Sequence, residues 1–179
     1  MGIIEHPIPA NNKIAPFLAE NIPGLWTYYC VSQPINVSNR FHAMPNWRTR
    51  SIGMQMFKYN IAGFLQWGYN FYNNQFSGDP INPFYEQSAD YAFQGGDAFS
   101  VYPAMDGTAL ESPRIVVFYE ALQDIKAMKL AEKLTSHEQV VAAIEDAYGQ
   151  AITFDTCAKS SEAMHRVREA VNAIIKANI

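Results

Sequence analysis

The residues with the clearest chemical potential are aromatic and amide side chains that follow a short apolar run. Trp67, Tyr69, Asn70 and Tyr72 all come within a few positions after Phe64–Leu65. A sugar presents an apolar ring face and a rim of hydroxyl groups, so aromatic rings beside amide groups match it chemically. These residues therefore predict one wall of a carbohydrate pocket. The alternative is that Trp67 belongs to the core and that only the residues after it are exposed.

Two further residues could reach the same pocket. Tyr28 closes a second apolar run, and Arg48 stands at the start of the helix predicted after it. A cation at a helix N-terminus opposes the helix macrodipole, so Arg48 and Arg50 both need another partner. Arg48 could bond a substrate hydroxyl, but the interpretation that we favour for both arginines is a salt bridge to a carboxylate such as Asp97. For Asp97 itself we expect a role in a turn or an ion pair.

The remaining titratable residues predict no catalytic group. The four histidines and two cysteines lack metal-ligand spacing, and the sequence indicates neither a metal nor an organic cofactor. Cys30 and Cys157 are expected to be buried free thiols. The only adjacent acidic pair, Glu145–Asp146, falls on a predicted helix, where we interpret it as a solvated face.

Composition describes one globular unit. The chain has 179 residues, of which 49% are hydrophobic and 17% charged. Its net charge is −4 without a basic stripe, which argues against nucleic acid as a partner. No apolar run approaches the roughly 20 residues that a membrane helix needs, and the first residues do not have the pattern of a signal peptide.

The hydrophobic pattern predicts strands and helices in an α/β order. A helix that begins at Asn46 as its cap and stops at Gly63 leads straight into a buried strand, which is the repeating step of such folds. The predicted strands span residues 3–9, 24–31, 64–67 and 98–102. The predicted helices span residues 46–62, 114–134, 136–148 and 160–178, with a short helical turn at 14–21 and a long loop at 73–107.

Several spaced blocks of this sequence resemble one family. They are Trp26–Cys30, Asn39–Phe41, Trp47–Arg50, Phe64–Asn70, Gly96–Pro103, Ser112–Arg114 and Glu120–Asp124. Together they resemble the C-terminal part of bacterial proteins similar to glycoside hydrolase family 123, a part often treated as a domain of unknown function. The resemblance runs from about residue 4 to about residue 134 and, more weakly, to the end of the chain.

The resemblance implies the last few βα units of a (β/α)8-type barrel, which in the family usually follows a β-sandwich. A complete barrel takes about 250 residues and eight strands, and three or four strands are readable here. We therefore expect a partial barrel at 1–134 and a helical extension packed on it at 135–179. The expected partners are carbohydrate and either a missing N-terminal half of the barrel or a second copy of the chain. If the chain is instead self-sufficient, it folds in another way.

The family resemblance also implies a function. Its enzymes remove N-acetylgalactosamine with an adjacent Asp-Glu pair, which is expected on an earlier barrel strand. The implied role is thus the C-terminal part of a glycoside hydrolase, with an aromatic and amide wall for N-acetylhexosaminides and no catalytic pair of its own. The alternatives are a non-catalytic carbohydrate-binding or structural module, and a helical interaction domain. Rings that cluster at strand ends disfavour the last. The resemblance implies a secreted or periplasmic parent protein.

Overall fold

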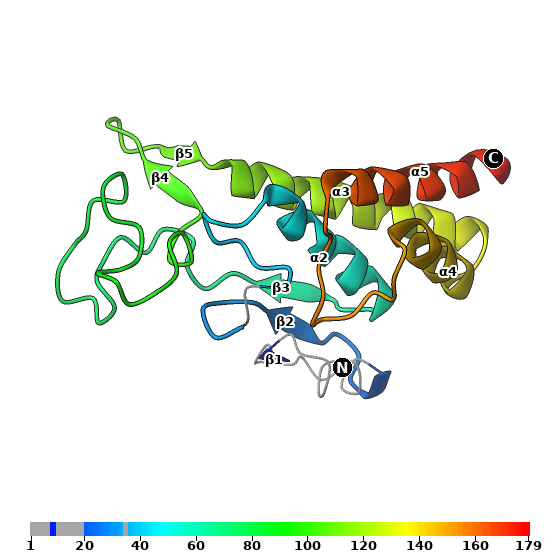
Figure 1. Ribbon diagram of the computed structural model, residues 1–179, viewed down its shortest axis with the longest axis horizontal. Coiled ribbons are helices and arrows are strands. Elements are labelled where there is room, and N and C mark those ends of the chain that lie inside the picture. Colours follow the sequence, from blue (N-terminus) through cyan, green and yellow to red (C-terminus); the bar gives the residue numbers. More distant parts are fainter. Residues whose placement is uncertain (1–7, 10–19, 34–35) are drawn as a thin grey trace.

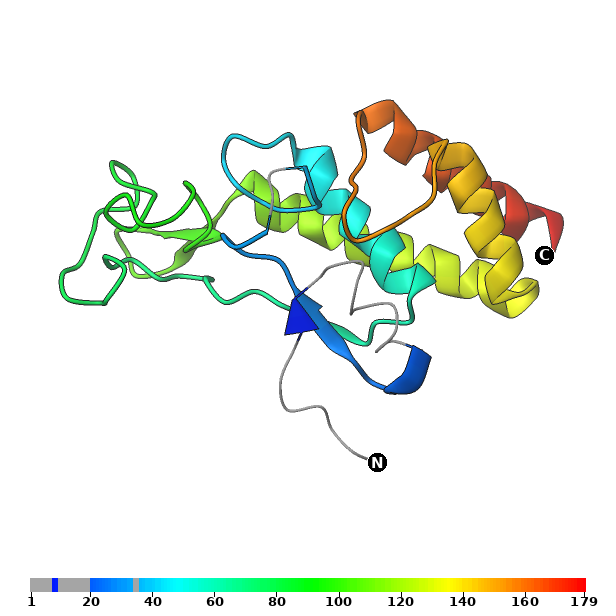
Figure 2. The same ribbon diagram turned by 60° about the horizontal axis from the view of Figure 1, so that its bottom comes forward.

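A computed structural model describes residues 8–9, 20–33 and 36–179 (Figure 1). A small parallel sheet lies along one side of the molecule and the helices cover one of its faces (Figures 1 and 2). A long loop with a short hairpin projects at one end, opposite the C-terminus. Within the described residues, no helix combines the length and the apolar character needed to span a bilayer.

The sheet consists of three parallel strands in the order β1-β2-β3. They are β1 (Ile8–Pro9), β2 (Trp26–Tyr28) and β3 (Gly63–Leu65). Thr27 is the register partner of Ile8 on one side and of Phe64 on the other. The helix α2 (Asn46–Lys58) connects β2 to β3, as parallel neighbours require. The two predicted strands at 24–31 and 64–67 are therefore present, although each is shorter than predicted.

The remaining helices form the other layer. They are α3 (Pro113–Leu134), α4 (His137–Tyr148) and α5 (Ser161–Ala177), close to the predicted bounds. On α4, Val140, Ile144 and Tyr148 recur at a spacing of four and all are buried. The core of this layer combines them with Phe57 from α2 and side chains of α3 and α5.

The N-terminal ends of the helices differ from one another. The hydroxyl groups of Ser136 and Ser160 accept hydrogen bonds from backbone N–H groups in the first turns of α4 and α5. Asn46 does not cap α2, because Pro45 occupies the cap position without a side-chain bond. Ser112 stands at the cap position of α3, but its hydroxyl makes no capping bond. The predicted helix end at Gly63 is also wrong, because Gly63 begins β3.

The chain after β3 does not continue the barrel pattern. Instead of a fourth parallel strand, β4 (Val101–Pro103) pairs antiparallel with β5 (Ala109–Glu111), a strand that sequence reasoning missed. Residues 73–100 contain no helix that could return the chain for another parallel strand. The partial (β/α)8 barrel is thus not confirmed; the architecture is mixed α/β, and the described strands do not close into a barrel.

Some predictions fall on residues that are not described. Most of the strand predicted at 3–9 and most of the helical turn predicted at 14–21 lie outside the described residues. Of the first, β1 at Ile8–Pro9 is described, and of the second, Glu20 and Asn21 are helical.

Candidate functional site

The carboxyl ends of β2 and β3 meet at one buried carboxylate. The indole Nε1 of Trp67, two residues beyond β3, donates to Asp97 Oδ2 at 3.0 Å. The backbone N–H of Val31, three residues beyond β2, donates to the same oxygen at 3.1 Å. Asp97 belongs to the long loop that returns to the sheet, so its side chain ties both strand ends and the loop together.

Two buried arginines, Arg40 and Arg114, lie close enough to this carboxylate for their charges to act on it. Arg40 is only 6% exposed, donates through Nη2 to the carbonyl of Tyr29 at 3.1 Å, and holds its guanidinium 4.7 Å from the Phe64 ring centre. Burial lowers the pKa of Arg40 to about 10. Burial also raises the pKa of the Asp97 carboxyl, although the bond from Trp67 and the charge of Arg40 work in the opposite direction.

The predicted pocket residues after β3 stay together at the surface. Trp67 is 38% exposed and packs its ring against Phe71 and Phe93, with ring centres 5.6 and 5.3 Å apart. Tyr69 and Asn70 are exposed beside it. An exposed ring with a fixed indole N–H is thus available here, and Trp67 is not a core residue.

Tyr72 and Tyr28, two other predicted pocket residues, make contacts within the protein. The Tyr72 hydroxyl donates to the carbonyl of Val101 at 2.8 Å, and its ring packs on Phe99. Tyr28 is half-buried at the end of β2 and pairs with Leu65 of β3. The structure therefore places Tyr28 on the strand adjacent to the one that leads to Trp67.

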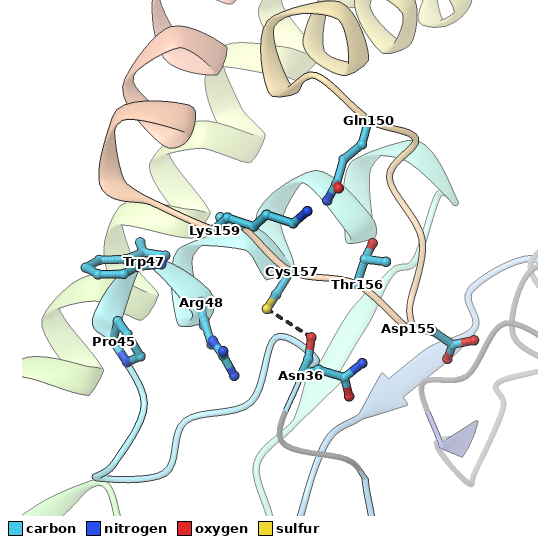
Figure 3. A pocket seen from close by; sticks show the side chains of 10 residues that line it. Asn36, Pro45, Trp47, Arg48, Gln150, Asp155, Thr156, Cys157 and Lys159 are labelled. Atoms are coloured by element: carbon cyan, nitrogen blue, oxygen red, sulfur yellow. Dashed lines mark hydrogen bonds between the residues drawn. The ribbon is translucent and has the colours of Figure 1, made fainter.

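Arg48 lies elsewhere. It lines a cavity of about 490 Å³ between the start of α2 and the connection from α4 to α5, with Trp47, Cys157 and Lys159 (Figure 3). None of the other predicted pocket residues lines this cavity. The expected salt bridge from Arg48 to Asp97 is wrong, because no ion pair joins these two side chains in the described structure.

Arg50 does form an ion pair, but with another partner. Its Nε donates to Asp124 Oδ2 at 2.6 Å and its Nη2 to Oδ1 at 3.0 Å. Arg168 of α5 donates to the same carboxylate at 2.9 Å. Asp124 of α3 therefore joins α2 to α5 through its two arginine partners. The predicted partner of Arg50 was Asp97, which takes no part in this ion pair.

Of the adjacent acidic pair, Asp146 is exposed as predicted, but Glu145 has a structural role. Glu145 accepts from Lys58 Nζ and from the backbone N–H of Ile152, each at 2.7 Å, so it is not the solvated residue that we predicted. Both cysteines are free; Cys157 is buried, whereas Cys30 is only half-buried. Across the described residues, no three histidine, cysteine or acidic side chains gather as they would around a metal ion.

Sequence reasoning missed the second arginine of this region. Arg114 on α3 is 6% exposed, and its Nη1 donates to the carbonyl of Gly96 and, at 3.4 Å, to that of Arg40. Gly96 adopts φ +87°, and its missing Cβ leaves the space that Arg114 and His42 fill. Arg40 and Arg114 each stood in a block that carried the family resemblance, which was the available signal.

Comparison with known proteins assigns the family. Residues 1–131 match the family model described as Glycoside hydrolase 123, catalytic domain. No curated protein matches the chain. The match covers 131 of 179 residues, and residues 132–179, with α4 and α5, lie outside it. This chain belongs to the glycoside hydrolase 123 family.

Proposed function

We propose that the residues at the ends of β2 and β3 form one wall of a carbohydrate site in a glycoside hydrolase. The observation that carries the proposal is the half-exposed indole of Trp67, held by a buried carboxylate. A sugar ring can stack on a fixed aromatic face at little cost in side-chain entropy. Tyr69 and Asn70 would add a second ring and an amide for the hydroxyl rim.

The sugar class follows from the family and not from the described contacts. Family enzymes act on N-acetylgalactosamine, so we propose an N-acetylhexosaminide as the ligand. Asn70 is exposed and has both an amide donor and an amide acceptor, which suits an acetamido group. Tyr28 and Tyr72 are proposed to support the wall rather than to contact the sugar extensively.

Catalysis would need an acid that these residues do not supply. The only adjacent acidic pair, Glu145–Asp146, lies on α4, and Glu145 is engaged by Lys58 and Ile152. Asp97 is 3% exposed and already accepts two hydrogen bonds, so we assign it to positioning Trp67. We propose that the catalytic pair comes from a further portion of the barrel. Within the described residues, β1 and β3 each pair on one side only, which leaves an edge for such a portion.

A non-catalytic module is the second candidate. The observation that favours it is the engagement of Asp97, Arg40 and Tyr72 in internal hydrogen bonds, which leaves few free polar groups at the surface. Both candidates bind sugar, so binding alone does not separate them. Hydrolysis of a chromogenic N-acetylgalactosaminide, assayed with the chain alone and with the remaining barrel portion supplied, does. Activity only in the second mixture supports the hydrolase, and none in either mixture supports the module.

Sugar binding can be tested with two tryptophans at opposite ends of the parallel strands. Trp67 follows the carboxyl end of β3, whereas Trp26 begins β2, at the opposite end of the strands, and is also partly exposed. We expect calorimetric titration with N-acetylgalactosamine to show binding that Trp67→Phe weakens and that Trp67→Ala weakens by up to about tenfold, since stacking on an aromatic ring contributes about 0.5–1.5 kcal/mol. Trp26→Phe is the matched control. Equal loss in the Trp26 and Trp67 variants would contradict the proposed wall.

A further inference from the structure

A second group of polar side chains borders a separate cavity. The cavity has a volume of about 280 Å³, and its lining includes His42, Tyr102, Ser112 and Arg114. These residues come from the β2–α2 connection, from β4 and from the start of α3. None of the six predicted sugar-wall residues lines this cavity, so whatever it binds is distinct from the proposed wall.

Two buried donors at this cavity have no partner. Ser112 is 4% exposed and Arg114 is 6% exposed. Within the described part of the chain, Ser112 Oγ and Arg114 Nη2 have no hydrogen-bond partner of adequate geometry, although the Tyr102 hydroxyl acts on the Arg114 guanidinium. A buried donor without a partner costs about 1–3 kcal/mol, and more when the group is charged, so two of them at one cavity call for an acceptor.

The charges of the region also do not balance. Arg40 and Arg114 are both buried, and Asp97 is the carboxylate that acts on both. None of the three belongs to an ion pair among the described residues. Asp97 directs Oδ2 to Trp67 and Val31 instead. One buried guanidinium is thus left without an anion, an arrangement that is costly unless a negative group enters.

The imidazole of His42 limits how much negative charge a ligand in this cavity can carry. His42 Nδ1 lies 3.2 Å from Gln87 Oε1, and its Nε2 lies 3.4 Å from the Tyr102 hydroxyl. Burial and the neighbouring charge of Arg114 lower the pKa of His42 below its ordinary 6.5, so the ring is neutral at pH 7. Only the guanidinium then remains to balance a ligand, which favours a group with a single negative charge.

We propose that this cavity binds a carboxylate or a sulfate ester, with Arg114 as the ion-pair partner and Ser112 as a second donor. A guanidinium donates two parallel bonds to such groups, and a serine hydroxyl can turn towards an acceptor at little cost. The volume suits a small molecule or one charged substituent of a larger one. The proposal stands without the sugar wall at Trp67, because it depends on different residues.

Calorimetric titration tests the proposal with two probes. Sodium glucuronate presents a carboxylate on a sugar ring, and sodium methyl sulfate presents a sulfate ester without a sugar. Sodium chloride at equal ionic strength is the blank. We expect at least one probe to bind the unmodified chain, and the tighter probe identifies whether the charge is carried as a carboxylate or as a sulfate. Failure of both probes to bind overturns the proposal.

Variants locate the binding. Arg114→Gln and Ser112→Ala should each weaken the bound probe, Arg114→Gln by about tenfold or more, because a charge-assisted bond is lost. If Arg114→Gln does not fold, Ser112→Ala provides the test, since the Ser112 hydroxyl makes no hydrogen bond in the structure and its loss should leave the fold intact. Ser160→Ala is the matched control, because this serine occupies the same cap position on α5 and does form its capping bond.

The outcomes separate this proposal from the sugar site. If Ser112→Ala and Arg114→Gln bind the probe as tightly as Ser160→Ala does, the cavity is not the site and the proposal is wrong. Trp67→Ala should leave probe binding unchanged while it weakens N-acetylgalactosamine. Loss of both ligands in Trp67→Ala would place the anion at the strand ends and overturn the assignment to Arg114.

Discussion

Substitutions of Asp97 can separate the contribution of its hydrogen bonds to stability from the contribution of its charge. Trp67 Nε1 and Val31 N both donate to the same oxygen, Oδ2. Asparagine can place its amide oxygen at that position, so Asp97→Asn can keep both bonds and remove only the charge. Asp97→Ala removes the acceptor for both. The two variants should therefore differ strongly in their free energy of unfolding.

The size of the difference follows from burial. Each donor left without a partner costs about 1–3 kcal/mol when it is fully buried. Trp67 and Val31 are each 38% exposed, so water can partly replace the lost acceptor. We expect Asp97→Ala to lower the free energy of unfolding by about 2–3 kcal/mol in total. Asp97→Asn should cost less than Asp97→Ala, because it keeps an acceptor for both donors and loses only the interaction of the charge with Arg40 and Arg114.

Urea unfolding at pH 7 measures both values. Asp106→Ala is the matched control, since its carboxylate also accepts two bonds, from Thr108 N and Oγ1, but in an exposed turn. It should destabilise the fold less than Asp97→Ala does. If Asp97→Asn proves as destabilised as Asp97→Ala, the charge and not the shared acceptor holds the strand ends, and the reasoning fails.

The pH dependence of the same pair gives an independent check. The folded-state pKa of Asp97 is raised above its ordinary 3.8, so the folded chain binds this proton more tightly than the unfolded chain. The resulting stabilisation is present below the ordinary value and is lost as pH rises through the raised pKa. The unfolding free energy of the unmodified chain minus that of Asp97→Asn should therefore fall as pH rises from about 3 to 7. A difference that rises with pH would show that the hydrogen-bond partners and neighbouring arginines, and not burial, determine the direction of the pKa shift of Asp97.

Three other changes probe the supports of the site. Asp124→Ala should lower the free energy of unfolding by about 3 kcal/mol, the low end for a broken buried ion pair because its arginine partners are partly exposed; a loss no larger than that of Asp146→Ala would contradict it. Tyr29→Phe should cost about 1–2 kcal/mol in the same assay, since it removes a buried 2.6 Å bond to a backbone carbonyl, and an unchanged midpoint would refute it. Gly96→Ala should cost about 2 kcal/mol or more, because φ is positive and Arg114 fills the space of a Cβ; Gly107→Ala, with a positive φ but open space, is the control.

Local signals in the sequence predicted the helical part of this fold well. Amphipathic spacing is a property of neighbouring residues, so α4 and α5 were placed nearly at their bounds. β5 was missed because its three residues are all exposed and show no alternation. The end of α2 was misplaced because Asn60, and not the glycine that follows, takes the left-handed conformation.

The candidate site was less predictable because it depends on contacts between distant segments. The aromatic and amide run after β3 was readable, as its residue types alone indicate a surface for sugars. The bond from Trp67 to Asp97 spans 30 positions, and no periodicity encodes it. The burial of Arg40 was equally hidden, since an arginine in a polar connection ordinarily lies at the surface. Arg48 was assigned to the pocket from its place in the chain, but the structure turns it into another cavity.

The residues outside the family match take part in holding the strand ends. Phe154 is fully buried in the same cluster as Tyr29, and its carbonyl accepts the hydrogen bond of the Tyr29 hydroxyl. Gln55 of α2 donates to the carbonyls of Thr153 and Thr156 at 2.7 and 3.0 Å. The connection between α4 and α5 is therefore bonded both to the end of β2 and to the helix that leads into β3. The chain segments that lead to Val31 and to Trp67 are therefore held partly by a segment that the family model does not include.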